Sequence, residues 1–423
     1  MNQDGAAPIG SAGSAGGEAG PPPNDAAGAE GQGPFGGPIP IVGEAGELYT
    51  GEGGGDGTGG DERSPGEGSP GEGSPGEGGT AEAGVTEGGE GGTAEAGVTE
   101  GGEGGATEAG VALASCIGLP ENCGPNADES CCTSLLVTGG TFYRDYDGTG
   151  LPSVAALATI SDFKLDKYEV TVGRFRQFVS AWASGWRPAE GSGKHTHLNN
   201  GAGLNASEIG WSAAWESAPM SPTKPLFPST VAAWNDTLAC YGTTWTPAAG
   251  PNETLPVTCT AFEETYAFCI WDGGFLPSEA EWNYAASGGA EQRIYPWGSQ
   301  TPTDALAVYA PCMVDPSCVS TVTQTRVGSD PAGNGKYGQA DLAGNMMERV
   351  LDGRGPPVNP CVDCALLGYE FPYPPFFSAP VSPVPVRGGS YNYDASYLFS
   401  AAEWVGYPWD RDSYLGFRCA RSP

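Results

Sequence analysis

Hydrophobic side chains are distributed very unevenly along the 423-residue chain. Residues 1–115 are mostly Gly, Ala, Pro, Ser, Thr and Glu, and their only aromatic residues are Phe35 and Tyr49. Such a segment buries too little apolar surface to offset the entropy that ordering costs. All 11 tryptophans and all 12 cysteines follow it. The pattern predicts a disordered segment over 1–115, followed by a globular region large enough for a substantial core.

The apolar positions of 160–182 predict a strand and then a helix. Alternation through Phe163, Leu165 and Tyr168 is typical of a half-buried strand. Thr171 is a favourable N-cap residue for a helix that starts directly after it. Four apolar residues then recur at helical spacing on one face: Phe175, Phe178, Val179 and Trp182.

Two further helices are predicted over 260–287. The sequence "DGG" ends the first of them, whose apolar stripe consists of Phe262, Tyr266 and Ile270. Ser278 begins the second as its N-cap, because Glu281 follows three residues later in a capping-box pattern.

The remaining globular sequence predicts loops, short strands and tight turns. From 185 to 258 the chain is rich in Gly, Pro and Trp and has no clean period, and beyond 288 Gly and Pro recur every few residues. His195 and His197 lie in the first of these stretches, where we expect two exposed loop histidines. As a pair they could bind a metal ion, but no third ligand is close in sequence.

The distribution of charge and the short sequence repeats further characterise the segment 1–115. It holds 20 acidic residues and one basic residue, Arg63, within a net charge of −33 for the whole chain. Short Gly-rich repeats start at Ser64, Thr80 and Thr93 and indicate a flexible, self-repelling linker. The acidity excludes nucleic acids and anionic membrane surfaces as partners. It serves either solubility or a specific cation-binding or partner-binding role.

The cysteines predict a disulfide-bonded domain. Residues 116–135 form a small Cys-rich opening segment before the main domain, 136–423. Its four cysteines, among turn residues, predict a disulfide knot: Cys116, Cys123, Cys131 and Cys132. The rival interpretation is a four-thiolate metal site, which two adjacent cysteines disfavour because they cannot easily offer two tetrahedral ligands to one ion.

Local bridges are predicted for three further pairs of cysteines. Cys240 with Cys259 and Cys312 with Cys318 each close a short loop. The third pair lies in "CVDC" at 361–364; a small disulfide loop is the favoured assignment, and a redox pair or half of a metal site are the alternatives.

Disulfides favour an oxidising compartment, yet the start "MNQDGAAPIG" lacks the basic and apolar regions of a signal peptide. No apolar run is long enough to predict a transmembrane helix. We therefore expect an extracytoplasmic protein whose signal or lipoprotein leader lies upstream of this sequence, with 1–115 as a tether. The alternative is a cytosolic protein with reduced thiols.

Six motifs occur in order across 160–423 and carry a family resemblance: "LDKYEVTVGRFRQFV", "AFCIWDGGFLPSEAEWNYAASGG", "YPWGS", "GQADLAGNMMERV", "VRGGSY" and "YLGFRCARSP". The chain resembles the sulfatase-modifying-factor family, which includes the formylglycine-generating enzymes. The resemblance implies an α+β, C-type-lectin-like fold that is loop-rich, with short strands and few helices.

The family's enzyme, in this resemblance, oxidises a sulfatase cysteine within a CxPxR motif to formylglycine, using oxygen and a copper(I) ion held by two cysteines. Ser390 matches the family's serine, but Tyr393 and Leu398 stand at the two cysteine positions. Copper(I) prefers sulfur ligands, so copper is not expected as a cofactor. Branches that hold iron with histidines are poorly matched by a chain with two histidines.

Other family features are implied at single positions. The resemblance pairs Cys269 with Cys419 in a structural disulfide. A second family disulfide would fall at Ala286 and near Glu403, and both halves are missing. The family's Lys-Arg before "LP" is replaced by Gly274 and Phe275.

A structural calcium ion is also predicted. Asp341 and Glu348 offer hard oxygen ligands, and a bend at Gly344 would turn backbone carbonyls toward them. The family pattern maps the calcium ligands to Asp341, Gly344, Met346 and Glu348. The family's second calcium site lacks its asparagine here and is not carried over.

The sequence thus favours a non-catalytic, monomeric binding or structural module whose ligand is a peptide, a protein or a glycan. An aromatic cleft would suit such ligands and would be lined by Tyr391, Tyr393, Tyr397, Trp404, Tyr407 and Trp409, although half of these are expected in the core. The alternative is a formylglycine-generating oxidase with an unusual ligand set, for which Cys361 and Cys364 are the candidates.

Overall fold

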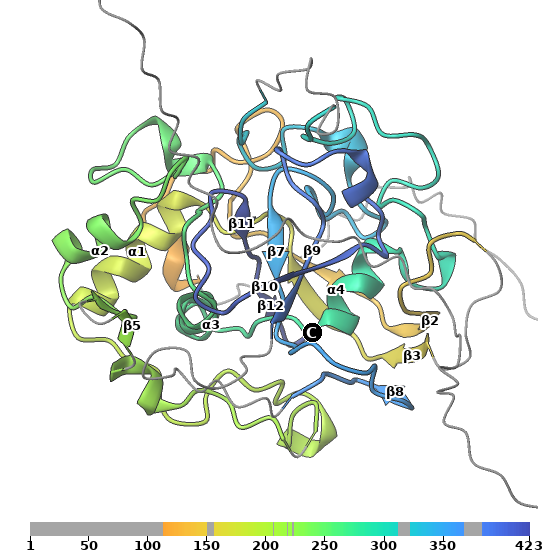
Figure 1. Ribbon diagram of the computed structural model, residues 1–423, viewed down its shortest axis with the longest axis horizontal. Coiled ribbons are helices and arrows are strands. Elements are labelled where there is room, and N and C mark those ends of the chain that lie inside the picture. Colours follow the sequence, from red (N-terminus) through yellow and green to blue (C-terminus); the bar gives the residue numbers. More distant parts are fainter. Residues whose placement is uncertain are drawn as a thin grey trace, which may run out of the picture. The chain divides into compact units, whose positions relative to one another are not determined.

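The computed structural model describes residues 113–149, 156–205, 207–217, 219–221, 224–311, 322–367 and 383–423 (Figure 1). The predicted disordered segment therefore lies almost entirely outside the described residues, as does the predicted pair Cys312–Cys318. The boundaries 116–135 and 136–423 stay predictions. No helix among the described residues has the length and apolar character needed to cross a bilayer.

Four short α-helices are present in the described residues: α1 (Val172–Ala183), α2 (Val231–Thr237), α3 (Phe262–Trp271) and α4 (Glu279–Ala286). Helix α1 packs against α2 and α3, whereas α4 packs against strand β3 (Leu157–Ile160) (Figure 1). Single 3₁₀ turns occupy η1 (Ala114–Cys116), η3 (Asn199–Gly201), η4 (Ala213–Ser217), η5 (Pro251–Thr254), η6 (Gly289–Glu291), η7 (Pro331–Gly333) and η8 (Ala395–Tyr397).

The strands form four small sheets in the described chain. The first has the order β1-β4-β12, the second β10-β9-β7-β11, the third β2-β3-β8, and the last pairs β5 with β6. All pairs are antiparallel except β11 with β7 and β3 with β8. The remaining bounds are β1 (Ser134–Val137), β2 (Gly140–Tyr143), β4 (Phe163–Asp166), β5 (Pro219–Ser221), β6 (Lys224–Pro225), β7 (Met347–Arg349), β8 (Cys361–Val362), β9 (Val384–Arg387), β10 (Glu403–Gly406), β11 (Leu415–Gly416) and β12 (Ala420–Arg421).

The predicted elements with clear capping signals are confirmed. Strand β4 holds Phe163 and Leu165, and α1 begins after Thr171, whose Oγ1 accepts a hydrogen bond from the Arg174 N–H at 3.3 Å. The apolar face of α1 is fully buried. Helix α4 begins at the predicted capping box. Ser278 Oγ accepts a hydrogen bond from the Glu281 N–H at 3.2 Å, and the Glu281 carboxylate accepts one from the Ser278 N–H at 2.8 Å.

The prediction that 185–258 consists of loops is wrong in part, because α2 lies inside it. Thr230 caps this helix by accepting a hydrogen bond from the Ala233 N–H, and Trp234 is its one buried residue. Two turns of helix with a single buried side chain are too short to show a period in the sequence.

The main core is an aromatic cluster around Phe175 of α1. Its ring stacks on Phe268 of α3 at 5.7 Å and meets Phe417 edge-on at 6.3 Å. The disulfide Cys269–Cys419 ties α3 to the same C-terminal segment, with Cα atoms 5.5 Å apart. The pairing that the family resemblance implied is therefore confirmed, together with Cys240–Cys259 and Cys361–Cys364.

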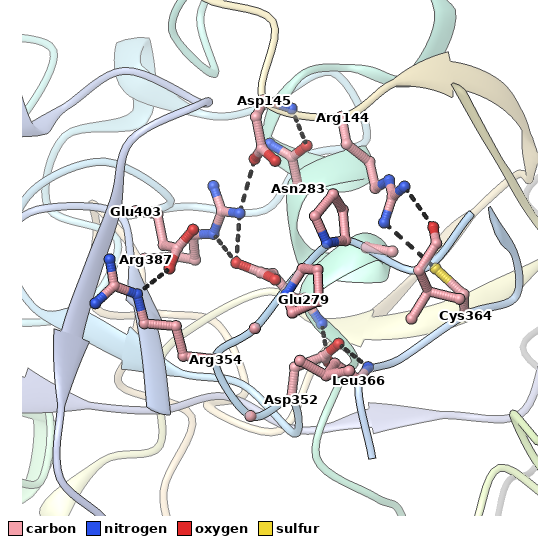
Figure 2. A pocket seen from close by; sticks show the side chains of 16 residues that line it. Arg144, Asp145, Glu279, Asn283, Asp352, Arg354, Cys364, Leu366, Arg387 and Glu403 are labelled. Atoms are coloured by element: carbon pink, nitrogen blue, oxygen red, sulfur yellow. Dashed lines mark hydrogen bonds and ion pairs between the residues drawn. The ribbon is translucent and has the colours of Figure 1, made fainter. Parts of the chain in front are cut away.

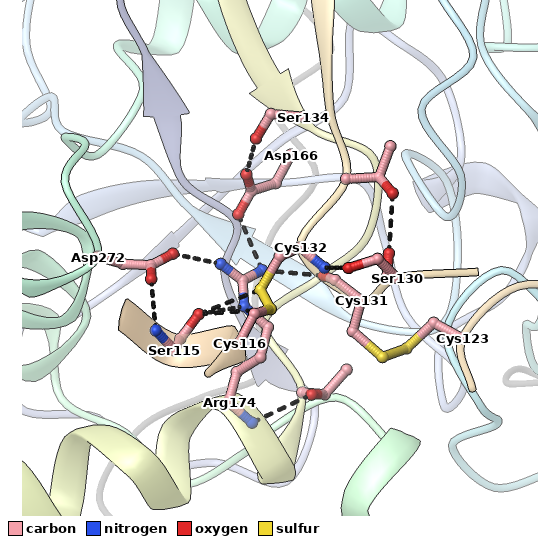
Figure 3. The surroundings of a disulfide bond; sticks show 12 residues. Ser115, Cys116, Cys123, Ser130, Cys131, Cys132, Ser134, Asp166, Arg174 and Asp272 are labelled. Carbon is pink, nitrogen blue, oxygen red and sulfur yellow. Dashed lines mark hydrogen bonds and ion pairs between the residues drawn. A yellow bond between two sulfur atoms is a disulfide. The ribbon is translucent and has the colours of Figure 1, made fainter. Parts of the chain in front are cut away.

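The opening segment is a disulfide knot, as predicted, and contains no free thiolates for a metal. Cys116 pairs with Cys132 and Cys123 pairs with Cys131. Figure 3 shows how the buried guanidinium of Arg174 holds this segment against the domain. Arg174 donates to Ser115 Oγ, the Cys131 carbonyl and two buried carboxylates, those of Asp166 and Asp272.

Candidate functional site

The segment that carries the family's catalytic positions follows β9 through two left-handed glycines. Gly388 and Gly389 have φ of 96° and 67°, and a Cβ on Gly389 would lie 2.7 Å from the Tyr397 carbonyl. This close approach needs glycine. The turn buries Ser390, whose hydroxyl donates to Asn392 Oδ1 at 2.7 Å.

Aromatic packing occupies the first cysteine position. Tyr393 is 8% exposed, and its ring centroid lies 4.7 Å from that of Tyr397 and 5.4 Å from that of Tyr414. Burial raises the pKa of the Tyr393 hydroxyl, which therefore stays neutral at physiological pH. A neutral phenol is a poor ligand for copper(I).

The second cysteine position is an apolar core residue. Leu398 is completely buried and packs with Ala307 and Ala343, flanked by the half-buried rings of Tyr295 and Trp297. The ten cysteines of the described residues are all in disulfides, so none of them offers a thiolate near this position. Neither position supplies the sulfur that the copper chemistry needs.

The expectation that half of the six aromatic residues of the predicted cleft lie in the core is confirmed. Tyr393, Tyr397 and Trp404 pack together and are at most 9% exposed. The other three are half-buried, with Tyr407 stacked on Trp409 at 5.2 Å. Tyr391, Tyr407 and Trp409 are therefore the rings of this set that keep exposed surface for a ligand.

The predicted calcium residues lie among buried carboxylates. Asp341 Oδ2 accepts a hydrogen bond from the Gly328 N–H at 2.6 Å. Glu348 accepts two hydrogen bonds from Arg418, and one from Trp282 Nε1 at 2.9 Å. Burial raises the pKa of Asp341 to about 6. Arg418 thus already compensates the charge of one predicted ligand, Glu348, and the calcium assignment stays a prediction.

A third carboxylate, Glu169, faces the same cluster and was missed from the sequence. It is fully buried, and Asn345 Nδ2 donates to its Oε2 at 2.6 Å. Its Oε1 has no hydrogen-bond partner among the described residues. Burial raises its pKa well above the usual value, and the nearby Asp341 and Glu348 add to the rise. Burial and the neighbouring carboxylates thus favour the protonated, neutral form of Glu169.

The prediction of two exposed histidines is wrong. His195 is completely buried between two carboxylates, with Nδ1 at 2.7 Å from Glu208 and Nε2 at 3.0 Å from Glu281. His197 is half-buried and stacks on Phe275. The carboxylate partners lie 13 and 86 residues away in sequence, so local composition could not reveal them.

The geometry of this site makes His195 a buried cation. Burial alone would lower the pKa of His195. The charges and hydrogen bonds of Glu281 and Glu208 together outweigh that effect and raise the pKa to about 9. No set of three or more His, Cys, Asp or Glu side chains in the described residues is arranged to hold a metal. His195 is therefore assigned to an internal ion network rather than to a metal pair.

Comparisons with known proteins give a family. The model of the sulfatase-modifying factor enzyme 1-like domain matches residues 120–423. The formylglycine-generating enzyme of Mus musculus is 28% identical over 152 residues, which cover 34% of this chain and 36% of that enzyme. The match thus spans about a third of that relative's length. The inactive C-alpha-formylglycine-generating enzyme 2 of Mus musculus is 29% identical over 163 residues, 36% of this chain and 46% of that protein.

The comparison with solved structures gives similarity at low sequence identity. PvdO from Pseudomonas aeruginosa superposes with a TM-score of 0.44 at 18% identity, covering 72% of this chain and 99% of that one. The short strands and few helices of the described residues agree with the α+β fold expected from the resemblance. The chain therefore belongs to the family defined by the sulfatase-modifying factor enzyme 1-like domain.

Proposed function

We propose that this chain is a non-catalytic member of the family that acts as an extracytoplasmic binding or structural module. The observation that carries the proposal is the packing of Tyr393 and Leu398, which puts a neutral phenol and a buried alkyl group where the chemistry needs two thiolates. Function follows from the residues of a site and not from its fold. The inactive relative from mouse supports the idea that the family scaffold persists without activity.

The proposed compartment rests on the disulfides. Five bridges join ten described cysteines, and such bridges persist in oxidising environments. In this proposal the acidic segment 1–115 is a tether that holds the domain away from its point of attachment. Peptides, proteins and glycans are the candidate ligands.

The full chain is expected to leave a CxPxR peptide unchanged when incubated with copper(I), oxygen and reductant. Mass spectrometry of the peptide cysteine measures conversion to formylglycine, and the mouse formylglycine-generating enzyme is the positive control. Conversion by this chain above the level of a no-protein blank would overturn the proposal. The variant Cys361→Ser/Cys364→Ser would then test the alternative ligand set, because loss of activity in this variant would show that these two cysteines carry the chemistry.

Structural calcium is part of the same proposal. The support for it is the orphaned Glu169 Oε1 and the raised pKa values of Glu169 and Asp341, because a bound divalent cation would stabilise the ionised forms of these carboxyl groups. Asp341, Glu348 and the carbonyls of Gly344 and Met346 would hold it. Calcium bound there would supply charge compensation and rigidity, and it would take no part in chemistry.

Calcium is expected to stabilise the full chain against thermal unfolding. At a concentration one hundred times its dissociation constant, the ion would add about 2.7 kcal/mol to the free energy of unfolding. The midpoint measured in 1 mM calcium should exceed that in EGTA, and Asp341→Asn should remove most of the difference. Glu291→Gln, at an exposed carboxylate, serves as the control. Equal midpoints with and without calcium would contradict the assignment.

A further inference from the structure

The disulfide of the "CVDC" motif has no role in the function proposed above. It joins Cys361 of β8 to Cys364, three positions along the chain. Strand β8 lies at an edge of the sheet β2-β3-β8, and the N–H of Asp363 donates to the Thr159 carbonyl of β3 at 2.9 Å. The bridge therefore closes a very short loop beside the edge of a small sheet.

A guanidinium contacts this disulfide directly. Figure 2 shows Arg144 beside Cys364, and its Nη1 donates to the Cys364 sulfur at 3.6 Å. Arg144 also donates to the Val358 carbonyl at 2.7 Å and to the Ala156 carbonyl at 3.4 Å, so backbone groups fix its orientation. An arginine next to a cysteine of a Cys-X-X-Cys motif favours the thiolate over the thiol. The positive charge thus stabilises the reduced form of the bridge more than the neutral disulfide.

A cavity gives access to the same cysteine. Cys364 lines a space of about 120 Å³ that also borders α4, β9 and the 352–358 loop (Figure 2). An apolar cavity of about 150 Å³ holds a benzene molecule, so this space admits the side chain of a cysteine. A thiol from another molecule can therefore reach Cys364, although this residue is only 5% exposed.

The other charged side chains of the cavity lining have partners of their own. They are Asp145, Glu279, Asp352, Arg354, Arg387 and Glu403. Arg387 pairs with Asp145 and Glu279, Arg354 pairs with Glu403, and Asp352 accepts hydrogen bonds from two backbone N–H groups. Asp363, between the two cysteines, accepts from the N–H and the hydroxyl of Ser161. Arg144 touches the sulfur itself, and its charge acts most strongly there because charge interactions weaken with distance.

Loop length acts in the same direction as this charge. A disulfide stabilises a protein by restricting the unfolded chain, and it does so more when its loop is longer. The other four bridges of the described residues span 8 to 150 positions. Cys361–Cys364 therefore gains least from its oxidised form, while Arg144 favours its reduced form. A disulfide whose reduced form is stabilised is a strong oxidant of other thiols.

We propose that Cys361–Cys364 is a thiol–disulfide exchange site that oxidises pairs of thiols on a partner polypeptide. Polypeptides are favoured as the source of the thiols because β8 is an edge strand in the described chain, with Val362 63% exposed beside Cys361. An extended segment can pair with the backbone of such an edge and place a cysteine next to the bridge.

The reaction consists of two exchanges. A partner thiolate attacks the Cys364 sulfur from the cavity, the bond to Cys361 breaks, and Cys361 takes the electron pair and a proton from water. The second partner thiolate then attacks the partner sulfur of this mixed disulfide and releases Cys364 as a thiolate beside Arg144. The partner loses two electrons and two protons and gains a disulfide. The two electrons reside on Cys361 and Cys364, and the second proton goes to solvent.

This activity goes beyond the proposed function and is independent of the family's copper chemistry. Its tests contain EDTA and no CxPxR peptide. Failure of the exchange reaction therefore leaves the oxidase result untouched, and formylglycine production would not by itself reveal disulfide exchange.

The first test is the equilibrium of the full chain with glutathione redox buffers. Acid quenching, alkylation and peptide mass spectrometry give the reduced fraction of each bridge. Cys361–Cys364 is expected to be half-reduced at a ratio of squared reduced to oxidised glutathione about tenfold or more below that for Cys240–Cys259, whose loop spans 19 positions. Half-reduction at an equal or higher ratio would overturn the proposal.

Variants of Arg144 separate its charge from its structural contacts. Arg144→Gln should raise the ratio for half-reduction about threefold or more and raise the pKa of the Cys364 thiol, measured by the ultraviolet absorbance of the thiolate. Arg144→Lys keeps a positive charge and should recover most of both changes. Arg293→Gln, outside the cavity lining, should change neither. An unchanged midpoint for Cys269–Cys419 shows that each variant is folded, and a thiol pKa that ignores Arg144→Gln would contradict the role given to this charge.

The last test measures the reaction itself. A reduced peptide with two cysteines, incubated without oxygen, is expected to yield one peptide disulfide for each wild-type chain and none with Cys361→Ser/Cys364→Ser. Equal yields from the two proteins would exclude the site. Comparing a peptide that has one cysteine with free cysteine identifies the source of the thiol: the peptide should form the mixed disulfide severalfold faster, and faster reaction of free cysteine would overturn the choice of a polypeptide.

Discussion

The variant Cys269→Ala/Cys419→Ala is expected to lose about 5 kcal/mol of the free energy of unfolding. This disulfide joins residues that are 150 positions apart, so it restricts a large part of the unfolded chain. It also ties α3 to the C-terminal segment beside the aromatic core around Phe175. Urea denaturation followed by tryptophan fluorescence measures the loss.

A second disulfide of the same chain provides the matched control. Cys361 and Cys364 are only three positions apart, and closing so short a loop contributes about 2 kcal/mol by the same chain-entropy relation. The variant Cys361→Ala/Cys364→Ala should therefore lose roughly 3 kcal/mol less than the first. Equal losses in the two variants would show that loop length does not decide the effect, and the account given for Cys269–Cys419 would fail.

The free energy of unfolding is expected to fall by about 3 kcal/mol through His195 alone as pH rises from 6 to 10. The pKa of His195 is about 9 in the folded protein, against an ordinary value of 6.5. Protonation therefore favours the folded state. The stabilisation is fully present below pH 6.5 and is lost as pH rises through 9, where the ring becomes neutral beside Glu208 and Glu281.

Comparison of two histidine variants isolates this effect from other titrating groups. His195→Gln should remove the part of the pH dependence that lies between 6.5 and 9, whereas His197→Gln should retain it. Burial lowers the pKa of His197, so its own contribution has the opposite sign and falls at lower pH. Urea denaturation at half-unit pH intervals gives the curves. A wild-type slope that survives in His195→Gln would contradict the assignment of the buried cation.

Local sequence signals determined several elements of this protein. Thr171 and Ser278 fix the starts of α1 and α4, because a cap and its partner lie within three residues of each other. The scarcity of apolar residues before Cys116 separates the acidic segment from the globular region. The identities of Tyr393 and Leu398 are also sequence facts, and it is the family resemblance that predicts their match to the two thiol positions.

Tertiary structure alone decided which polar groups meet. His195 lies between carboxylates from two distant segments, and Arg174 bridges the opening segment to Asp166 and Asp272. Capping and periodicity act over a few residues and can be read along the chain, whereas ion pairs and cavities form between residues that only the packing of the core brings together.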